Sequence, residues 1–172
     1  MSLLNIVTYP AEILLQPTKP IEAFDEKLKK LASDMIETMN AASGVGLAAN
    51  QVNVILQIGI ISLAEDRKKT PENKEYLIFA NPKIIEGKNE VMSKEGCLSL
   101  PDFSEEVPRF EELTVLFLDI NNMIQRRKLV ALPAIAFQHE LDHLNGITLL
   151  NRVSKLKVRL YKKELMKAAK IS

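Results

Sequence analysis

Apolar residues recur at steps of three and four in two long stretches, which is the spacing of an amphipathic helix. The first helix is expected from Asp25 to Ser43, because Asp25 is a suitable N-cap and Gly44 follows the pattern. A last helix is expected from Ser154, its cap, through Ala169, with Val158, Tyr161, Leu165 and Ala168 on one face. Between them, a helix from about Pro133 to Leu144 is predicted, because proline suits a first turn and Asn145-Gly146 suits an end.

Other stretches have the composition of strands. Val54 to Ile61 is almost continuously apolar and β-branched, which indicates a strand buried on both faces. Further strands are predicted at Tyr76 to Phe79, Lys83 to Glu86, Leu113 to Ile120 and Met123 to Val130, the last two joined by a hairpin at Asn121-Asn122. The polar segment Glu65 to Glu75 is predicted to be a surface loop. Strands that do not alternate with helices indicate an α+β fold. We expect antiparallel or mixed sheets packed around a central helix, with an N-terminal and a C-terminal helix beside them.

Composition narrows the class of protein. The 172 residues (19.3 kDa) fit a single domain, residues 1–172. A hydrophobic fraction of 47% with 26% charged residues excludes a disordered chain, and a net charge of +1 gives no global basic field for DNA. No apolar run is long enough for a bilayer and no leader pattern is visible, so a cytoplasmic protein without membrane contact is expected. The one cysteine suits a reducing compartment.

The expected central helix carries the sequence HELDH, with His139, Glu140 and His143. Two imidazoles four residues apart share a helix face and can bind one metal ion. A glutamate next to the first histidine can act as general base toward a water on that ion. The alternative is that two core histidines fall at this spacing by chance.

A third ligand must come from elsewhere, because the chain has no further histidine. Glu164 lies in the basic last helix, which leaves Cys97 as the better candidate. One thiolate with two imidazoles is a ligand set of open, catalytic sites, whereas structural zinc sites usually have four protein ligands. Taken alone, Cys97 also suits the role of a small buried hydrophobic residue.

Two further segments have features of a catalytic site. In EGCLSLP, residues 95–101, the backbone N–H of Leu98 beside the presumed ligand could stabilise an oxyanion, and Glu95 is either a partner of a ligand or a solvated carboxylate. In GVGLAANQ, residues 44–51, the two glycines permit close approach of a ligand, and Gln51 could offer its amide to an oxyanion. A plain turn and a satisfied strand-edge amide are the alternatives.

Together, GVGLAANQ, EGCLSLP and QHELDHLNG resemble the three motifs of the peptide deformylase family, in the same order and over nearly the whole chain. The resemblance implies a metallohydrolase that removes the formyl group from the N-terminal formyl-methionine of nascent polypeptides. It implies Cys97, His139 and His143 as metal ligands, with water in the fourth position, and Glu140 as general acid and base. Gln51 and the Leu98 N–H would hold the oxyanion, and the Gly46 backbone would bind the substrate peptide. The resemblance favours Fe²⁺ as the cellular ion, while Zn²⁺, Ni²⁺ or Co²⁺ also suit these ligands.

Helix spacing adds a candidate pocket for the methionine side chain. Ile135 and Leu132 precede His139 on the ligand face, and with Val45 they could form an apolar slot, core packing being the alternative. The chain departs from the family pattern at three positions. Asn50 replaces a small residue or proline, Ala131 stands where a glycine often opens the ligand helix, and Ser104 replaces a basic residue. Arg109 is then the nearest basic candidate for substrate contact.

Residues 155–170 contain seven lysines and arginines and one acid. This charge indicates either a solvated helix face or a surface that contacts ribosomal RNA. Two other functions compete with the deformylase interpretation. A zincin-like peptidase would cleave unformylated peptides and would not need Cys97, and a catalytically silent homologue would bind metal or peptide without turnover.

Overall fold

The computed structural model describes residues 2–64 and 75–171. Five antiparallel strands form one sheet in the order β1-β2-β3-β4-β5. The elements are η1 (Glu12–Leu15), α1 (Glu26–Ala41), β1 (Gly46–Ala48), η2 (Ala49–Val52), β2 (Ile58–Ser62), β3 (Tyr76–Cys97), β4 (Leu100–Leu118), β5 (Ile124–Val130), α2 (Ala131–Leu144), η4 (Leu149–Asn151) and α3 (Lys155–Ile171). The predicted α+β class is confirmed, with a single antiparallel sheet in place of several sheets.

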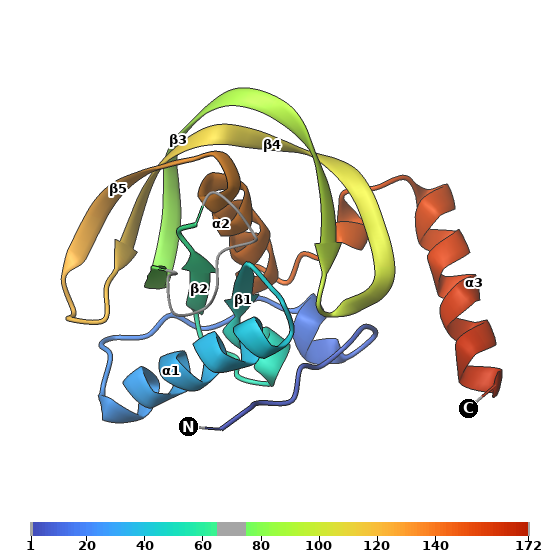
Figure 1. Ribbon diagram of the computed structural model, residues 1–172, viewed down its shortest axis with the longest axis horizontal. Helices are drawn as coiled ribbons and strands as arrows, with labels where there is room; N and C mark the ends of the chain where they lie inside the picture. The colour runs from blue at the N-terminus through green and yellow to red at the C-terminus, as the bar shows by residue number, and fades with distance from the viewer. Residues whose placement is uncertain (1, 65–74, 172) are drawn as a thin grey trace.

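Strands β3 and β4 are much longer than the rest and arch over α2, while α1 lies on the other side of β1 and β2 (Figure 1). Helix α2 is therefore enclosed, and Ala134 and Phe137 on it have no exposed surface. Phe137 packs against Phe79 of β3 with ring centroids 4.6 Å apart. An enclosed helix has little freedom to shift, so the side chains it carries are held in place by the core around it.

The three predicted helices are present. Asp25 caps α1 by accepting a hydrogen bond from the Leu28 N–H at 2.8 Å, as expected. Helix α2 begins at Ala131, two residues before the predicted Pro133, and ends at the predicted Leu144. Helix α3 begins after Ser154 and runs to Ile171. Apolar spacing predicted α1 and α3, and the proline and Asn145-Gly146 signals predicted α2.

Two of the strand predictions need correction. The strand predicted at Val54 begins only at Ile58. The two strands predicted at Tyr76–Phe79 and Lys83–Glu86 are parts of one strand, β3. Asn81-Pro82 falls at an irregularity in the pairing with β4, between Ala80 and Lys83, so the missing proline N–H costs no ladder hydrogen bond. The segment predicted as a loop, residues 65–75, lies almost wholly outside the described residues.

The largest part of the sheet that the sequence did not predict is the outer half of the β3–β4 hairpin. Most of residues 83–96 are exposed or half-buried, and the facing residues of β4 carry four acidic side chains, Glu105, Glu106, Glu111 and Glu112. With both faces largely in water, the sequence has no apolar alternation to mark the strands. The pairing of β3 with β4 holds these residues in place, and it positions Cys97 at the end of β3.

The N-terminal end of α2 is strained. Ala131 has φ of +53°, a left-handed conformation that costs a residue with a Cβ roughly 1–2 kcal/mol. Glycine adopts this conformation freely but loses about 0.5–1 kcal/mol in chain entropy. The position where the sequence departs from the family glycine is therefore one where the backbone favours glycine.

We expect Ala131→Gly to raise stability by about 0.5–1 kcal/mol, because it relieves the left-handed strain at a smaller entropic cost. Thermal unfolding followed by circular dichroism should show a midpoint about 1–4 °C higher. The control is Ala134→Gly in the regular part of α2, which should lower the midpoint because its backbone is helical and its methyl group is buried. An unchanged or lower midpoint for Ala131→Gly would mean that the position is not strained.

Candidate metal centre

Three potential metal ligands meet between the end of β3 and the middle of α2. The Nε2 atoms of His139 and His143 lie 3.2 Å apart, and the Cys97 Sγ lies 3.2 Å from the His143 Nε2. All three ligand atoms fall within 4.8 Å of one another. His139 and His143 are four residues apart on α2, so one helix face presents both rings, while Cys97 arrives from a strand more than forty residues earlier.

The donor set fits a divalent ion. Metal–nitrogen distances of about 2.0–2.1 Å and a metal–sulfur distance of about 2.3 Å place the ligand atoms of a tetrahedral site roughly 3.3–3.6 Å apart, close to the two separations of 3.2 Å found here. The Nδ1 of His139 donates to Glu95 Oε2 at 2.9 Å, which leaves its Nε2 with a lone pair directed at the cluster. Cys97, His139 and His143 therefore form a metal site, and three protein ligands leave room for a further, non-protein ligand.

Glu140 lies beside this cluster and is almost completely buried. Its Oε2 has no hydrogen-bond partner among the described residues. Burial raises the pKa of Glu140 to about 7, against the opposing effect of the nearby His139. A carboxylate with this pKa and a free oxygen is suited to accept and return a proton near neutral pH.

Gly46 on β1 makes room for that carboxylate. A Cβ atom at position 46 would lie 2.3 Å from Glu140 Oε1 and 2.9 Å from its Cγ, far inside van der Waals contact. Sequence reasoning linked this glycine to the approach of a ligand backbone. The structure adds a second reason, because only a residue without a side chain lets Glu140 occupy its position.

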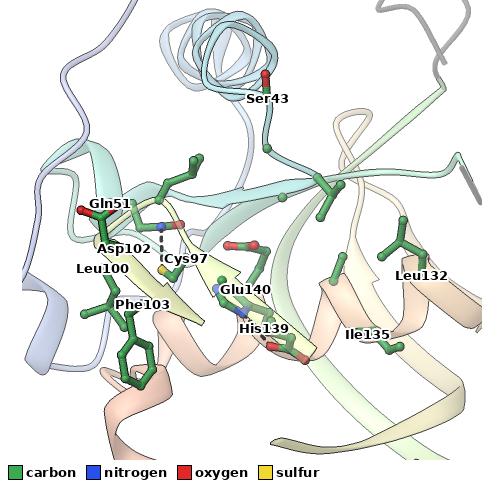
Figure 2. Close-up of a pocket in the computed structure, with 17 residues that line it drawn as sticks. Ser43, Gln51, Cys97, Leu100, Asp102, Phe103, Leu132, Ile135, His139 and Glu140 are labelled. Atoms are coloured by element: carbon green, nitrogen blue, oxygen red, sulfur yellow. Dashed lines mark hydrogen bonds and ion pairs between the residues drawn. The ribbon is translucent and has the colours of Figure 1, made fainter. Parts of the chain in front are cut away.

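Both the oxygen and the nitrogen of the Gln51 side-chain amide, on η2, form hydrogen bonds. Its Oε1 accepts a hydrogen bond from the Ala48 N–H at 2.9 Å, and its Nε2 donates to Ser99 Oγ at 3.1 Å. The same Nε2 lies 3.8 Å from Cys97 Sγ, so the amide faces the metal site (Figure 2). Asn50, the preceding residue, is buried and donates to the backbone carbonyl of His143. Asn50, which departs from the family pattern, thus contacts the helix that carries two of the metal ligands.

A buried chain of ion pairs continues behind His139. Arg109 donates through Nε and Nη2 to the two oxygens of Glu95, at 2.8 and 2.9 Å, and through Nη1 to Asp142 Oδ2 at 2.7 Å. Arg152 contacts both oxygens of Asp142. Burial alone would raise the pKa of Glu95, but hydrogen bonds from His139 and Arg109 outweigh it and bring the pKa to about 2. Glu95 is therefore ionised and fixes the orientation of His139.

The expectation that Arg109 contacts substrate needs correction. Its side chain is 2% exposed and faces Glu95 and Asp142, and it does not line the pocket beside the metal site. Ser104, the other position considered for substrate contact, is exposed and also lies outside that pocket. The sequence shows that Arg109 is basic, but only the fold shows that two acidic side chains surround it.

A pocket of about 310 Å³ opens beside the metal site. In Figure 2, Leu132 and Ile135 lie on one side of His139 and Glu140, and Leu100, Asp102 and Phe103 lie on the other. The predicted residues Val45, Gly46, Gln51, Cys97, Leu98, Leu132, Ile135, His139 and Glu140 all line it. His143 lies behind them and is 1% exposed.

Sequence reasoning missed several residues of the site. Leu100 and Phe103 line the pocket, Ser99 holds Gln51, and Asp142 and Arg152 extend the ion-pair chain. For Asp142 a signal existed, because it stands inside HELDH between the two histidines. Nothing in the sequence relates Arg152 to the site, since the contact depends on how the chain turns after α2.

Comparison with known proteins identifies the family. The sequence model described as polypeptide deformylase matches residues 3–159. The chain belongs to the peptide deformylase family. A peptide deformylase of Desulfotalea psychrophila is 41% identical over 167 residues and 97% of each chain, and one of Helicobacter pylori is 44% identical over 166 residues, 96% of this chain and 94% of that one.

Solved structures agree with this assignment. The crystal structure of a peptide deformylase from Ehrlichia chaffeensis in complex with actinonin superimposes with a TM-score of 0.89 at 36% identity, over 98% of each chain. That of the Legionella pneumophila enzyme gives 0.87 at 35% identity, over 99% of this chain and 97% of that one. The activity of the chain is accordingly that of a peptide deformylase, a metal-dependent amidohydrolase with a Cys/His/His site. Within the described residues, no helix has the length and apolarity needed to cross a bilayer.

We expect Gly46→Ala to lower kcat/KM by about 10- to 100-fold if Glu140 acts as general acid and base, because the added methyl group displaces its carboxyl group and such catalysis is worth about 10²–10⁴ in rate. Metal content should not change, since the three atoms nearest to the new methyl group all belong to Glu140, which is not one of the ligands. Gly44→Ala is the comparison, with its Cβ 3.0 Å from the flexible Leu98 side chain, and should cost less. Wild-type turnover in Gly46→Ala would show that Glu140 does not need its present position.

Proposed function

We propose that this enzyme deformylates nascent polypeptides with Glu140 as general acid and base beside a metal ion held by Cys97, His139 and His143. The observation that carries the proposal is the buried Glu140 carboxylate next to the ligand cluster, with one oxygen lacking a partner and a pKa of about 7. When bound, the ion supplies Lewis-acid activation of a water molecule and of the formyl oxygen. Fe²⁺ is our proposal for the cellular ion, with Zn²⁺, Ni²⁺ or Co²⁺ as substitutes in purified protein.

In this proposal two donors stabilise the negative charge that develops on the formyl oxygen. One is the backbone N–H of Leu98, directly after the ligand Cys97. The other is the Gln51 amide, whose position is fixed by its bonds to the Ala48 N–H and to Ser99. Donors that are oriented before the reaction lose no energy in reorganising during it.

The substrate chain would lie across the pocket with its methionine side chain among Val45, Leu132 and Ile135. These side chains are half-buried and apolar, which suits a flexible thioether. The backbone of Gly46 would hydrogen-bond the peptide. Actinonin, present in the Ehrlichia chaffeensis structure, should then occupy the same pocket here and compete with formylated peptides.

The proton steps follow from the position of Glu140. Its carboxylate accepts a proton as a water molecule attacks the formyl carbon. It then gives this proton to the nitrogen of the methionine as the C–N bond breaks, which releases formate and a free amino terminus. Both transfers use one carboxyl group, because burial keeps its pKa near neutrality.

We expect Glu140→Gln to bind metal as the wild-type enzyme does but to hydrolyse a formyl-Met-Ala peptide at least about 100-fold more slowly, because the amide cannot take up the proton. Formate release and metal content are measured on the same anaerobic preparation, which also gives the identity of the native ion. Hydrolysis of unformylated peptides, unaffected by Cys97→Ser, would favour a zincin-like peptidase. Metal binding without turnover in the wild type would indicate a silent homologue.

We further propose that α3 contacts ribosomal RNA and brings the enzyme to nascent chains. The helix stands at the side of the molecule (Figure 1) and docks through Tyr161, which is buried, packs against the Phe103 ring at a tilted angle and donates to the Pro101 carbonyl at 3.0 Å. A shallow groove along it is lined mainly by basic side chains, namely Lys155, Arg159, Lys162, Lys163, Lys167 and Lys170 with Val158 and Met166. A basic surface of this kind suits a phosphate backbone.

Replacing Lys162, Lys163 and Lys167 by glutamine should weaken binding to purified ribosomes and reduce the slope of log K against log salt by about 2–3, if each lysine neutralises one phosphate. The same triple replacement at the exposed Lys27, Lys83 and Lys94 is the control and should leave the slope in place. Turnover of a short formylated peptide should stay the same in both. Equal ribosome affinity in all three proteins would exclude α3 as the contact.

The domain organisation of the chain and its cellular compartment are also proposals. We propose that residues 1–172 act as one catalytic domain that works in the cytoplasm, where nascent chains appear. The family match over residues 3–159 supports this for most of the chain and stops inside α3.

A further inference from the structure

Arg152 lies outside every motif that defines the site, yet it contacts the chain of charged groups behind the metal ligands. It follows η4, in the turn between α2 and α3, and its side chain is one-third exposed. Its Nε and Nη2 contact the two oxygens of Asp142. This two-point contact fixes both the position and the plane of the carboxylate.

From Asp142 the contacts lead to a metal ligand. Asp142 accepts from Arg109 Nη1 at 2.7 Å, Arg109 donates twice to Glu95, and Glu95 accepts from His139 Nδ1 at 2.9 Å. Each residue of this series keeps the next one in place. The series thus connects the partly exposed Arg152 to the imidazole ring of His139 through hydrogen bonds between charged groups.

Charge balance makes Arg152 necessary to the series. Glu95 and Asp142 carry two negative charges, and Arg109 and Arg152 carry two positive charges. Glu95, Arg109 and Asp142 are all buried, with side chains 2–11% exposed. Without Arg152, one buried guanidinium would have to serve two buried carboxylates, which is costly at low local dielectric. Arg109 would then move toward Asp142 and loosen its hold on Glu95.

We propose that Arg152 is a positioning residue of the metal centre. By neutralising and orienting Asp142, it lets Arg109 hold Glu95 in the geometry that aims the His139 ring at the metal. It touches neither the substrate pocket nor the ligands, and its effect on the site passes through the other three charged residues. The proposal concerns retention of the metal and goes beyond the proton and oxyanion roles assigned above.

The test is Arg152→Met, which keeps an unbranched, flexible side chain but removes the guanidinium group with its charge and donors. Zn²⁺-loaded protein is mixed with a chromogenic chelator, and the rate of metal release is followed. We expect release about 10-fold faster than in the wild type, the lower end of the 10- to 100-fold loss of affinity that follows a change in a direct partner of a metal ligand, because Arg152 acts on such a partner, Glu95, through two other residues. The absorption spectrum of Co²⁺-loaded protein should shift as the His139 ring reorients. With a formylated peptide, kcat should fall while KM stays within about twofold.

Three further variants complete the experiment. Arg152→Lys restores the charge and should bring release to within about threefold of wild type, and Arg126→Met, at an exposed arginine of β5, should behave as wild type. Asp142→Asn combined with Arg152→Met removes one charge of each sign and should release metal more slowly than Arg152→Met alone. The double variant also tests the proposal if Arg152→Met alone does not fold.

A lower melting temperature with wild-type metal release would overturn the proposal, because Arg152 would then only stabilise the fold. Release from the double variant as fast as from Arg152→Met would equally contradict the role of charge balance. Metal release and the Co²⁺ spectrum are both measured without substrate, so they do not depend on turnover. A failure of the proposed deformylase mechanism would appear in the Glu140 variant and leave these measurements unaffected.

Discussion

The structure depends on bringing one sulfur and two imidazole nitrogens together from separate elements. Helix spacing alone places His139 and His143 side by side, but Cys97 reaches them only because the long β3–β4 hairpin folds over α2 and ends at that point. The rest of the fold holds these three atoms close together. The sheet encloses α2, and the aromatic contact of Phe137 with Phe79 lies in the core between them.

Burying so many charged groups is possible because each has a partner. Glu95, Arg109 and Asp142 would each be costly to bury alone, and breaking such a pair typically costs about 3–5 kcal/mol. Here they hold one another and orient His139. Glu140 is the exception, since one of its oxygens lacks a partner within the described residues. An unpaired carboxylate oxygen beside a cluster of metal ligands is the kind of exception that often lies at a functional site.

Backbone constraints also shape the site. Gly46 is required because the Glu140 side chain fills the space of its missing Cβ. Ala131 accepts a left-handed conformation at the point where β5 turns into the ligand helix. In both places the tertiary arrangement determines the local conformation. At Ala131 it does so against the preference of the residue, which shows that the packing of α2 outweighs about 1–2 kcal/mol of local strain.

The amino-acid sequence alone determined the three helices, the α+β class, the HELDH pair of ligands and the single cysteine available to complete them. These features are local, because helix periodicity and a four-residue spacing act within one element. The sequence could not show that β3 continues past Asn81-Pro82 or that the polar hairpin is a sheet, because those strands are stabilised by pairing and not by an apolar face. Nor could it show that Arg109 faces Glu95 and Asp142, or that Arg152 completes their charge balance. Such contacts join residues 10 to 33 positions apart, and only the packing of α2 against the hairpin and the turn that follows α2 bring them together.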